Sequence, residues 1–201
     1  MGGLFISFEG IEGCGKSTQV ELLGGALAPR DPLVVREPGG TELGEGIRQL
    51  VLHGDEPMAA EAEMYLYMAA RAELLARRIK PALEQGRVVV ADRYHDSTLA
   101  YQGGGRGART FWPEEFPLPD RTFLLALPAE RGLERRRASG RRLDRLESEP
   151  LDFHRRVESA YEELAAREPA RWVRLDAEEA PERIHERVLD VLAPLLEPVS
   201  A

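Results

Sequence analysis

The sequence predicts an α/β fold, with a five-stranded parallel sheet flanked by helices on both faces. Short apolar segments alternate along the chain with longer segments in which apolar residues recur every three or four positions, the spacings of strands and amphipathic helices. Strands that alternate with helices in this way favour a parallel sheet covered on both sides. No internal repeat or low-complexity linker interrupts the pattern, so we expect residues 1–201 to form one domain.

Five apolar segments are expected to be the strands, at residues 4–8, 33–35, 87–91, 122–127 and 172–175. The third is the clearest, because a near-continuous β-branched sequence is typical of a strand buried on both faces. Helices are expected at residues 18–27, 43–52, 60–84, 97–102, 129–138, 150–167 and 181–196. Pro81 should kink the end of the third helix, and Gly103–Gly105 should break the chain after the fourth.

The composition excludes several function classes. No apolar segment is long enough to span a bilayer, and no basic segment precedes a cleavable apolar one, so we expect a cytoplasmic protein without a membrane partner. The net charge of −8 argues against nucleic-acid binding, which usually needs a dominant basic surface. Because Cys14 is the one cysteine, the chain can form no internal disulfide or multi-cysteine metal site. The chain also lacks asparagine, which excludes the Asn-Lys-x-Asp element of guanine-binding GTPases.

Residues 10–17, Gly-Ile-Glu-Gly-Cys-Gly-Lys-Ser, fit the pattern Gly-x-x-x-x-Gly-Lys-Ser/Thr and stand between the first expected strand and helix. A strand that turns into a helix leaves several backbone N–H groups free, and glycines let that backbone close around an anion. Lys16 would reach the β- and γ-phosphates, and Ser17 would offer its hydroxyl to Mg²⁺. A glycine-rich turn with a chance Lys-Ser is the alternative, which the flanking elements disfavour. We therefore predict a P-loop NTPase-type site for a nucleoside triphosphate, formed by Gly10, Ile11, Glu12, Gly13, Cys14, Gly15, Lys16, Ser17 and Thr18.

Asp92 and Arg93 follow the third expected strand. Ligands of parallel sheets bind beyond the carboxyl ends of the strands, where Gly10, Glu37 and Asp92 should meet. The carboxylate of Asp92 could hold Mg²⁺ through water opposite Ser17, and the guanidinium of Arg93 offers a planar fork to phosphate oxygens. An isolated Asp-Arg pair is more often a surface ion pair, but the buried strand and the phosphate loop favour the functional interpretation.

Six arginines occur in the eleven positions from Arg135 to Arg145 of this acidic chain. Such a run of charge is usually a solvated surface. The alternative, which we favour, is a lid at about residues 135–149 that closes over the triphosphate and brings positive charge to the transferred group. Gly140 would be its flexible point.

Two expected helix faces could shape a pocket for a second substrate. Residues four apart share a helix face. The pairs with this spacing are Tyr67 with Arg71, Ser97 with Tyr101, and Thr98 with Gln102. An aromatic ring beside a guanidinium suits a flat base with exocyclic carbonyls. Taken alone, each pair is more often core packing with a surface charge, and the spacing leaves both interpretations open.

Together the motifs resemble those of bacterial thymidylate kinase, a P-loop nucleoside monophosphate kinase family. The resemblance extends from about residue 4 to the last helix, and it is carried by the phosphate loop, residues 36–41, 67–71, 92–106, 143–147 and 175–177. It implies an ATP- and Mg²⁺-dependent kinase that phosphorylates dTMP to dTDP in dTTP biosynthesis, as a cytoplasmic homodimer. A kinase for another monophosphate is a rival with the same fold. A nucleotide switch or partition-type ATPase is less favoured, because the loop has a single lysine and a second pocket is expected.

The resemblance also implies roles for individual residues around the nucleoside of dTMP. Glu12 would approach the 3′-hydroxyl of the deoxyribose, and Tyr101 would crowd the 2′ position and exclude ribonucleotides. Tyr67 would stack on thymine, and Arg71 would donate to its carbonyl edge. The remaining residues expected in this part of the substrate site are Ser97, Thr98 and Gln102.

Around the phosphates, the resemblance implies that Arg48 and Arg93 grip the dTMP phosphate, against a wall ordered by Arg36 and Glu37. Gly13 occupies the loop position at which some family members carry a catalytic arginine, so a lid arginine is expected to supply it. The candidates are the lid arginines Arg141, Arg142 and Arg145, and the resemblance does not distinguish between them. The predicted catalytic set is Lys16, Arg93, Arg141, Arg142 and Arg145, and the predicted metal-binding residues are Ser17 and Asp92.

Residues 108–120 depart from the family pattern, because three prolines disfavour the helix usual at this place. The resemblance therefore does not predict how residues 108–120 pack at the edge of the acceptor pocket. The four histidines have no metal-ligand spacing and are interpreted as surface or packing residues: His53, His95, His154 and His185.

Overall fold

The computed structural model describes residues 2–54 and 56–196. Within these residues it contains one five-stranded, fully parallel sheet, which confirms the predicted fold class. In chain order the strands are β1 (Phe5–Glu9), β2 (Leu33–Arg36), β3 (Val89–Asp92), β4 (Arg121–Ala126) and β5 (Trp172–Asp176). Across the sheet they lie in the order β2-β3-β1-β4-β5, so β1 and the loop that follows it are central.

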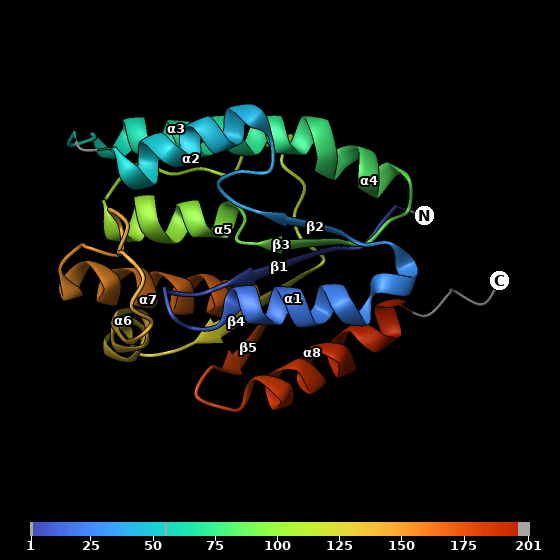
Figure 1. Ribbon diagram of the computed structural model, residues 1–201. Helices are drawn as coiled ribbons and strands as arrows, with labels where there is room; N and C mark the ends of the chain where they lie inside the picture. Colours follow the sequence, from blue (N-terminus) through green and yellow to red (C-terminus); the bar gives the residue numbers. More distant parts are fainter. Residues whose placement is uncertain (1, 55, 197–201) are drawn as a thin grey trace.

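Helices cover both faces of the sheet (Figure 1). The long helices are α1 (Lys16–Ala26), α2 (Glu42–His53), α3 (Ala60–Leu74), α6 (Ala129–Ala138), α7 (Leu151–Arg167) and α8 (Pro181–Leu196). In Figure 1, α2 and α3 lie above the sheet and α1 and α8 below it. A short 3-10 turn, η1 (Ala28–Arg30), leads from α1 towards β2.

Alternate residues of β1 and β3 belong to two different hydrophobic clusters, because successive strand side chains point to opposite faces. Phe5 and Val89 pack with Leu74 of α3 on one face. Ile6 and Val90 join the cluster that contains residues of α1, α7 and α8 on the other. The sheet is thus buried on both sides, and its functional groups can reach solvent at the strand ends.

The expected 60–84 helix is continuous but contains an unexpected π-helical segment, η2 (Leu75–Ile79), between α3 and α4 (Lys80–Glu84). Pro81 stands in the first turn of α4. A proline lacks the N–H of the regular helix, and its ring clashes with the carbonyl four residues earlier. The wider π-helical segment immediately before it relieves this conflict, so the predicted kink takes the form of a local widening.

The helix expected at residues 97–102 begins earlier and ends later than predicted. It comprises α5 (His95–Thr98) and a π-helical segment, η3 (Leu99–Gly105), so the prediction that Gly103–Gly105 break it is wrong. These glycines serve close packing against α7 instead. A Cβ atom on Gly105 would lie 2.5 Å from Cε2 of Phe153, and one on Gly104 would lie 2.5 Å from the Cβ of Ala160.

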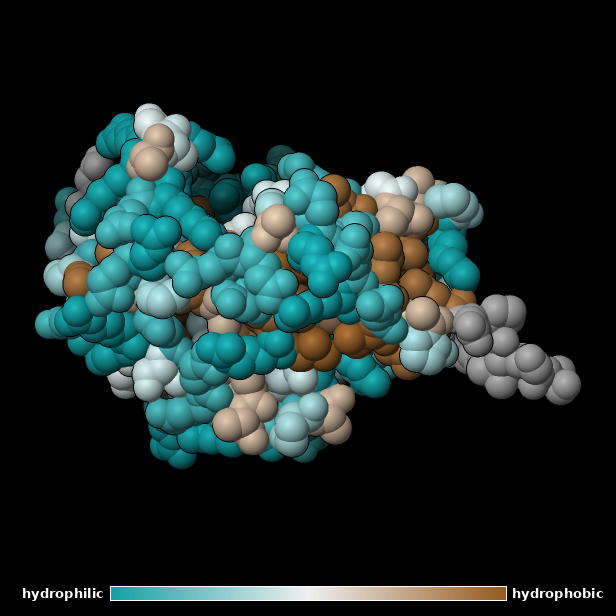
Figure 2. All heavy atoms as spheres, turned by 90° about the horizontal axis from the view of Figure 1, so that it is seen from below, coloured by the Kyte–Doolittle hydropathy of each residue, from teal (hydrophilic) through white to brown (hydrophobic). Residues whose placement is uncertain are grey.

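Residues 107–120 form no regular helix, as the prolines predicted. Trp112 and Phe116 of this segment pack in edge-to-face contact with His95, and so cover the start of α5. None of the helices in the described part of the chain combines the length and the apolar character needed to cross a bilayer. The face seen in Figure 2 is mainly hydrophilic, with a hydrophobic patch on the side where α8 ends.

Candidate active site

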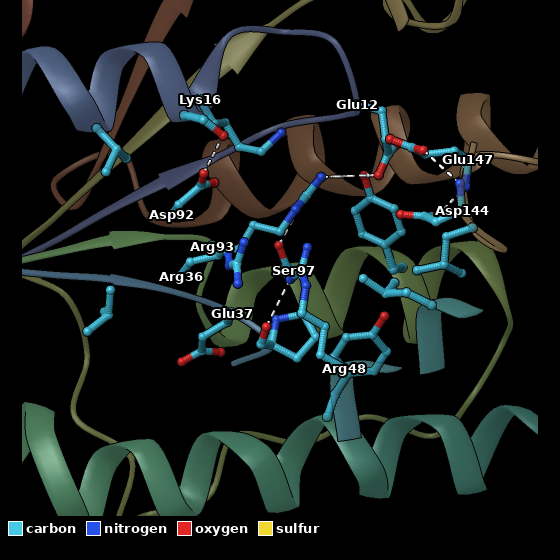
Figure 3. A pocket seen from close by; sticks show the side chains of 18 of the residues that line it. Glu12, Lys16, Arg36, Glu37, Arg48, Asp92, Arg93, Ser97, Asp144 and Glu147 are labelled. Carbon is cyan, nitrogen blue, oxygen red and sulfur yellow. Dashed lines mark hydrogen bonds and ion pairs between the residues drawn. The ribbon is translucent and has the colours of Figure 1, made fainter. Parts of the chain in front are cut away.

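A crevice of about 1100 Å³ lies where β1, β2 and β3 end. Figure 3 shows Arg93 in its centre, between Lys16 and Asp92 on one side and Glu12 on the other. The crevice brings together most of the predicted site residues: Glu12, Gly13, Gly15, Lys16, Ser17, Thr18, Arg36, Glu37, Arg48, Tyr67, Arg71, Asp92, Arg93, Ser97, Thr98, Tyr101, Gln102, Arg141 and Arg142. Gly10, Ile11 and Cys14 are buried in the loop beneath it. Arg145 is not part of its lining, and instead borders a second hollow.

The phosphate loop joins the end of β1 to the start of α1. Gly10, Gly13 and Gly15 all have positive φ angles, at 135°, 73° and 97°, which other residues rarely adopt. The ammonium of Lys16 lies across the loop, where it donates to the carbonyl oxygens of Gly10 at 3.0 Å and Ile11 at 2.7 Å. The loop therefore presents a positive charge and the free N–H groups of a helix start to the same space.

Ser17 and Asp92 come together from α1 and β3. The hydroxyl of Ser17 donates to Oδ2 of Asp92 at 2.6 Å. A hydroxyl and a carboxylate are the oxygen ligands that suit Mg²⁺, which usually retains several waters and binds substrate phosphates. No group of three or more His, Cys, Asp or Glu side chains in the described residues could hold a metal alone. The pair therefore fits a magnesium ion that is also held by phosphates.

Arg93 has a φ angle of 71°, a rare conformation for a residue with a side chain. Its Nη1 donates to the Gly10 carbonyl at 3.0 Å, and its Nη2 donates to Glu12 and Tyr101 at 3.1 Å each. Burial alone would lower the pKa of Arg93, but the neighbouring phenols and carboxylates raise it well above the usual value. The guanidinium is thus fixed in charge and in orientation.

A buried network beneath Arg93 includes two residues that the sequence analysis missed, Glu9 and Tyr161. Glu9 accepts hydrogen bonds from the Tyr94 N–H at 2.7 Å, the Ser97 hydroxyl at 2.6 Å and the Tyr161 hydroxyl at 2.8 Å. Burial and the nearby charge of Asp96 raise the pKa of Glu9 to about 7. Ser97, predicted as a substrate residue, also accepts from Arg93 at 3.1 Å and so supports it from below.

Glu12 faces the crevice from the phosphate loop. It accepts hydrogen bonds from Tyr101 and Arg93, and its Oε2 lies 3.5 Å from Nδ1 of His154. Burial opposes ionisation, but His154, Arg93 and Lys16 outweigh it and lower the pKa of Glu12 to about 2. His154 is therefore buried against the site, a position that histidine spacing could not reveal.

Arg71 is buried and largely occupied by protein groups. Its Nε donates to Glu37 at 2.6 Å, its Nη1 to Thr98 at 2.9 Å, and its Nη2 to the Tyr94 carbonyl at 3.1 Å. Nη1 also lies 3.1 Å from Nδ1 of His95, so this histidine is buried in the network as well. Burial raises the pKa of Glu37 to about 7, against the lowering effect of Arg71. The expected contact between Arg71 and thymine would therefore have to use an N–H group of the guanidinium that is not donated to these protein acceptors.

The other two predicted arginines of the acceptor wall lie further out. Arg48 is half-buried and donates to the Pro38 carbonyl at 2.9 Å. Arg36 is more than half exposed and pairs with Glu45 at 3.3 Å, at the rim. Figure 3 shows both guanidinium groups near Arg93, so three positive charges converge on one part of the crevice.

The lid follows α6 and folds back on itself. Arg136 pairs with Glu147, which also accepts from the Asp144 N–H at 2.8 Å. Arg141 and Arg142 are exposed and line the crevice. Arg145 instead donates to the Val51 carbonyl at 2.9 Å and binds Glu63 of α3. The structure thus separates the three lid candidates into two that face the crevice and one that faces α3.

Glu63 is a further residue that the sequence analysis missed. It is fully buried and accepts from Nε2 of Gln102 at 2.8 Å, as well as from Arg145. Its spacing of four from Tyr67 and eight from Arg71 places all three on one face of α3, a signal that could have found it.

Comparisons with known proteins agree with this geometry. The sequence model of the family described as thymidylate kinase matches residues 8–188. A thymidylate kinase of Halothermothrix orenii is 49% identical over 199 residues, covering 94% of this chain and 95% of the relative. One of Thermomicrobium roseum is 50% identical over 193 residues, with 92% and 91% coverage. The crystal structure of thymidylate kinase from Ehrlichia chaffeensis has a TM-score of 0.75 and 29% identity, covering 96% of this chain and 99% of that one. With a phosphate loop and a cluster of arginines that line one crevice, and with relatives matched along nearly its whole length, the chain belongs to the thymidylate kinase family.

Proposed function

We propose that this thymidylate kinase, which phosphorylates dTMP to dTDP, places the triphosphate of ATP on the 10–18 loop and the phosphate of dTMP on Arg93. One observation carries the proposal: Lys16 and Arg93 both donate to the Gly10 carbonyl, each at 3.0 Å. Because Lys16 and Arg93 share this carbonyl oxygen, their positive charges lie next to each other. A donor phosphate bound to Lys16 and an acceptor phosphate bound to Arg93 would therefore be neighbours. Proximity of this kind is the main requirement of phosphoryl transfer.

The reaction needs charge and position more than proton transfer, because the acceptor phosphate is already anionic. Lys16 would neutralise the β- and γ-phosphates, and the loop N–H groups would hold their oxygens. Ser17 and Asp92 would hold the Mg²⁺ of ATP, supported by their 2.6 Å contact. When bound, that ion would supply positive charge that offsets the negative charge of the ATP phosphates.

For the acceptor, we propose that Arg48 and Arg93 bind the dTMP phosphate, with Arg36 at the rim. Glu12 would accept from the 3′-hydroxyl, supported by its low pKa, about 2, which keeps it ionised. Tyr101 donates to Glu12 and lies under Arg93, so a ribose 2′-hydroxyl would meet its ring. The base would lie between Tyr67 of α3 and residues 98–102 of α5 and η3, all of which belong to segments that line the crevice.

Among the lid candidates, we propose that Arg141 and Arg142 supply transition-state charge and that Arg145 does not. The first two are exposed and line the crevice, whereas Arg145 is bound to Glu63 and the Val51 carbonyl. Lid arginines that close on the transferred group would also exclude water from the crevice. Excluding water strengthens the electrostatic interactions between the charged groups inside it.

The assignment is tested with the purified protein, ATP-Mg²⁺ and a panel of dTMP, dCMP, GMP and AMP, with EDTA as the metal control. We expect dTMP to be phosphorylated fastest and EDTA to abolish the reaction. If dTMP reacts no faster than the other monophosphates, the proposed acceptor site is wrong.

We also propose that two copies form a dimer through α2 and α3. Leu43 and Leu50 of α2 are 54% and 50% exposed, and Tyr65 of α3 is 58% exposed, although each is large and apolar. Leu43 and Leu50 lie seven residues apart and so share a helix face. Light scattering should give twice the chain mass for the native protein and the single chain mass for Leu50→Glu. A monomeric native protein would contradict this proposal.

A further inference from the structure

Glu63 is the buried meeting point of three segments that are far apart in the sequence. Its side chain is 0% exposed and lies in α3, one turn before Tyr67. Gln102 of η3 donates to Oε1 at 2.8 Å, and Arg145 of the lid binds Oε2. Arg106 lies further away, with Nε 3.6 Å from Oε1.

These contacts determine how the Gln102 amide is turned. A carboxylate can only accept hydrogen bonds, so the NH₂ end of Gln102 must face Glu63. The amide oxygen is the end that remains for the crevice, which Gln102 lines. A side-chain amide can turn either its oxygen or its NH₂ group towards the crevice. In Gln102 the hydrogen bond to Glu63 decides which of the two points there.

We propose that Glu63 is a specificity-determining positioning residue, which turns Gln102 so that the crevice presents a hydrogen-bond acceptor to the base. An acceptor there favours a base that carries an imino N–H, such as thymine, over one whose ring nitrogen is itself an acceptor, such as cytosine. The inference rests on the proposed placement of the base beside Gln102. Glu63 acts through Gln102 and does not touch the substrate.

The substitution Glu63→Gln should change the base selectivity in one predictable direction. Arg145 can only donate and is the arginine within hydrogen-bond distance of Glu63, whereas Nε of Arg106 lies 3.6 Å away and makes no hydrogen bond, so Arg145 will bind the amide oxygen of the new side chain. The new NH₂ group then faces Gln102, whose amide must turn over and present NH₂ to the crevice. The variant should therefore shift selectivity towards a base with a ring acceptor.

The measurement is the ratio of kcat/KM for dTMP to that for 5-methyl-dCMP, two substrates that differ only on the hydrogen-bonding edge of the base. We expect Glu63→Gln to lower this ratio about tenfold or more, the effect of one misplaced hydrogen bond. Arg145→Lys is the matched control, because it keeps a cation on Oε2 and a carboxylate facing Gln102, and it should retain the ratio. An unchanged ratio in Glu63→Gln would overturn the inference.

Gln102→Leu separates this inference from the proposed base site. If Gln102→Leu lowers the ratio but Glu63→Gln does not, Glu63 has no positioning role. If Gln102→Leu leaves the ratio unchanged, the base does not lie beside Gln102, and both proposals fail.

A second variant covers the case in which Glu63→Gln does not fold, which a thermal unfolding curve would show. The exchange Glu63→Gln with Gln102→Glu restores the donor–acceptor pair and again leaves an acceptor-only group facing the crevice. It should retain the native ratio. A folded exchange variant that loses the ratio would overturn the inference.

Discussion

The two halves of the crevice are built differently. In the donor half, main-chain carbonyls of the phosphate loop, at Gly10 and Ile11, hold Lys16. In the acceptor half, side chains from distant segments hold one another: Arg71 is 34 residues from Glu37, and Arg93 is 81 residues from Glu12. The donor half therefore depends on local backbone geometry, whereas the acceptor half depends on the whole fold. Substitutions in the two halves should accordingly have different consequences.

The largest effect is expected at the centre of the donor half. Lys16→Ala should lower kcat/KM for ATP by about a thousandfold, because it removes the charge that faces the transferred phosphate. Lys80→Ala is the matched control, since Lys80 is the other lysine of the chain and lies in α4, outside the crevice lining. Steady-state kinetics would contradict this account if Lys16→Ala retained full turnover.

In the acceptor half, Arg93→Lys should lower kcat/KM for dTMP by about a hundredfold. Lysine keeps the charge but loses the planar fork that Gly10, Glu12 and Tyr101 orient, and misplacement by about 1 Å can cost this much. Arg174→Lys, on the exposed side of β5, should leave the rate unchanged. Near-native kinetics for Arg93→Lys would mean that charge alone is sufficient.

The lid arginines should each have a smaller effect, because two neighbours share the role. Arg141→Ala and Arg142→Ala are each expected to lower kcat about tenfold, with the double variant lower still. Arg137→Ala, on the exposed part of α6, is the control. A large fall in kcat for Arg145→Ala alone would show that the lid rearranges more than we propose.

The smallest effect concerns stability. The pKa of Glu12 in the folded protein is about 2, below its ordinary value of 4.5, so its ionised form stabilises the fold above pH 4.5 and this stabilisation is lost as the pH falls towards 2. Between pH 6 and pH 3.5 the linked loss is about 1.4 kcal/mol. Urea unfolding of Glu12→Gln should lack this loss, and an equal pH dependence in both proteins would contradict the assignment.

The same difference explains what could be predicted from the sequence. The strands, the long helices and the phosphate loop follow from local patterns, and the structure has them within a few residues. The π-helical segments do not, because η3 depends on how closely α7 approaches Gly104 and Gly105. Likewise, the sequence predicts the same role for Arg145 as for Arg141 and Arg142, because only the fold shows that the partner of Arg145 is Glu63 of α3. Glu9 and Tyr161 stand 152 residues apart, so no local motif could join them.

The most direct test of two separable halves is calorimetric titration of ATP-Mg²⁺ and of dTMP, each alone, into Lys16→Ala and Arg48→Ala. We predict that Lys16→Ala weakens ATP binding at least about tenfold and leaves dTMP binding within about twofold, and that Arg48→Ala does the reverse. If either variant weakens both ligands equally, the crevice is one coupled site, and its division into a local donor half and a non-local acceptor half is wrong.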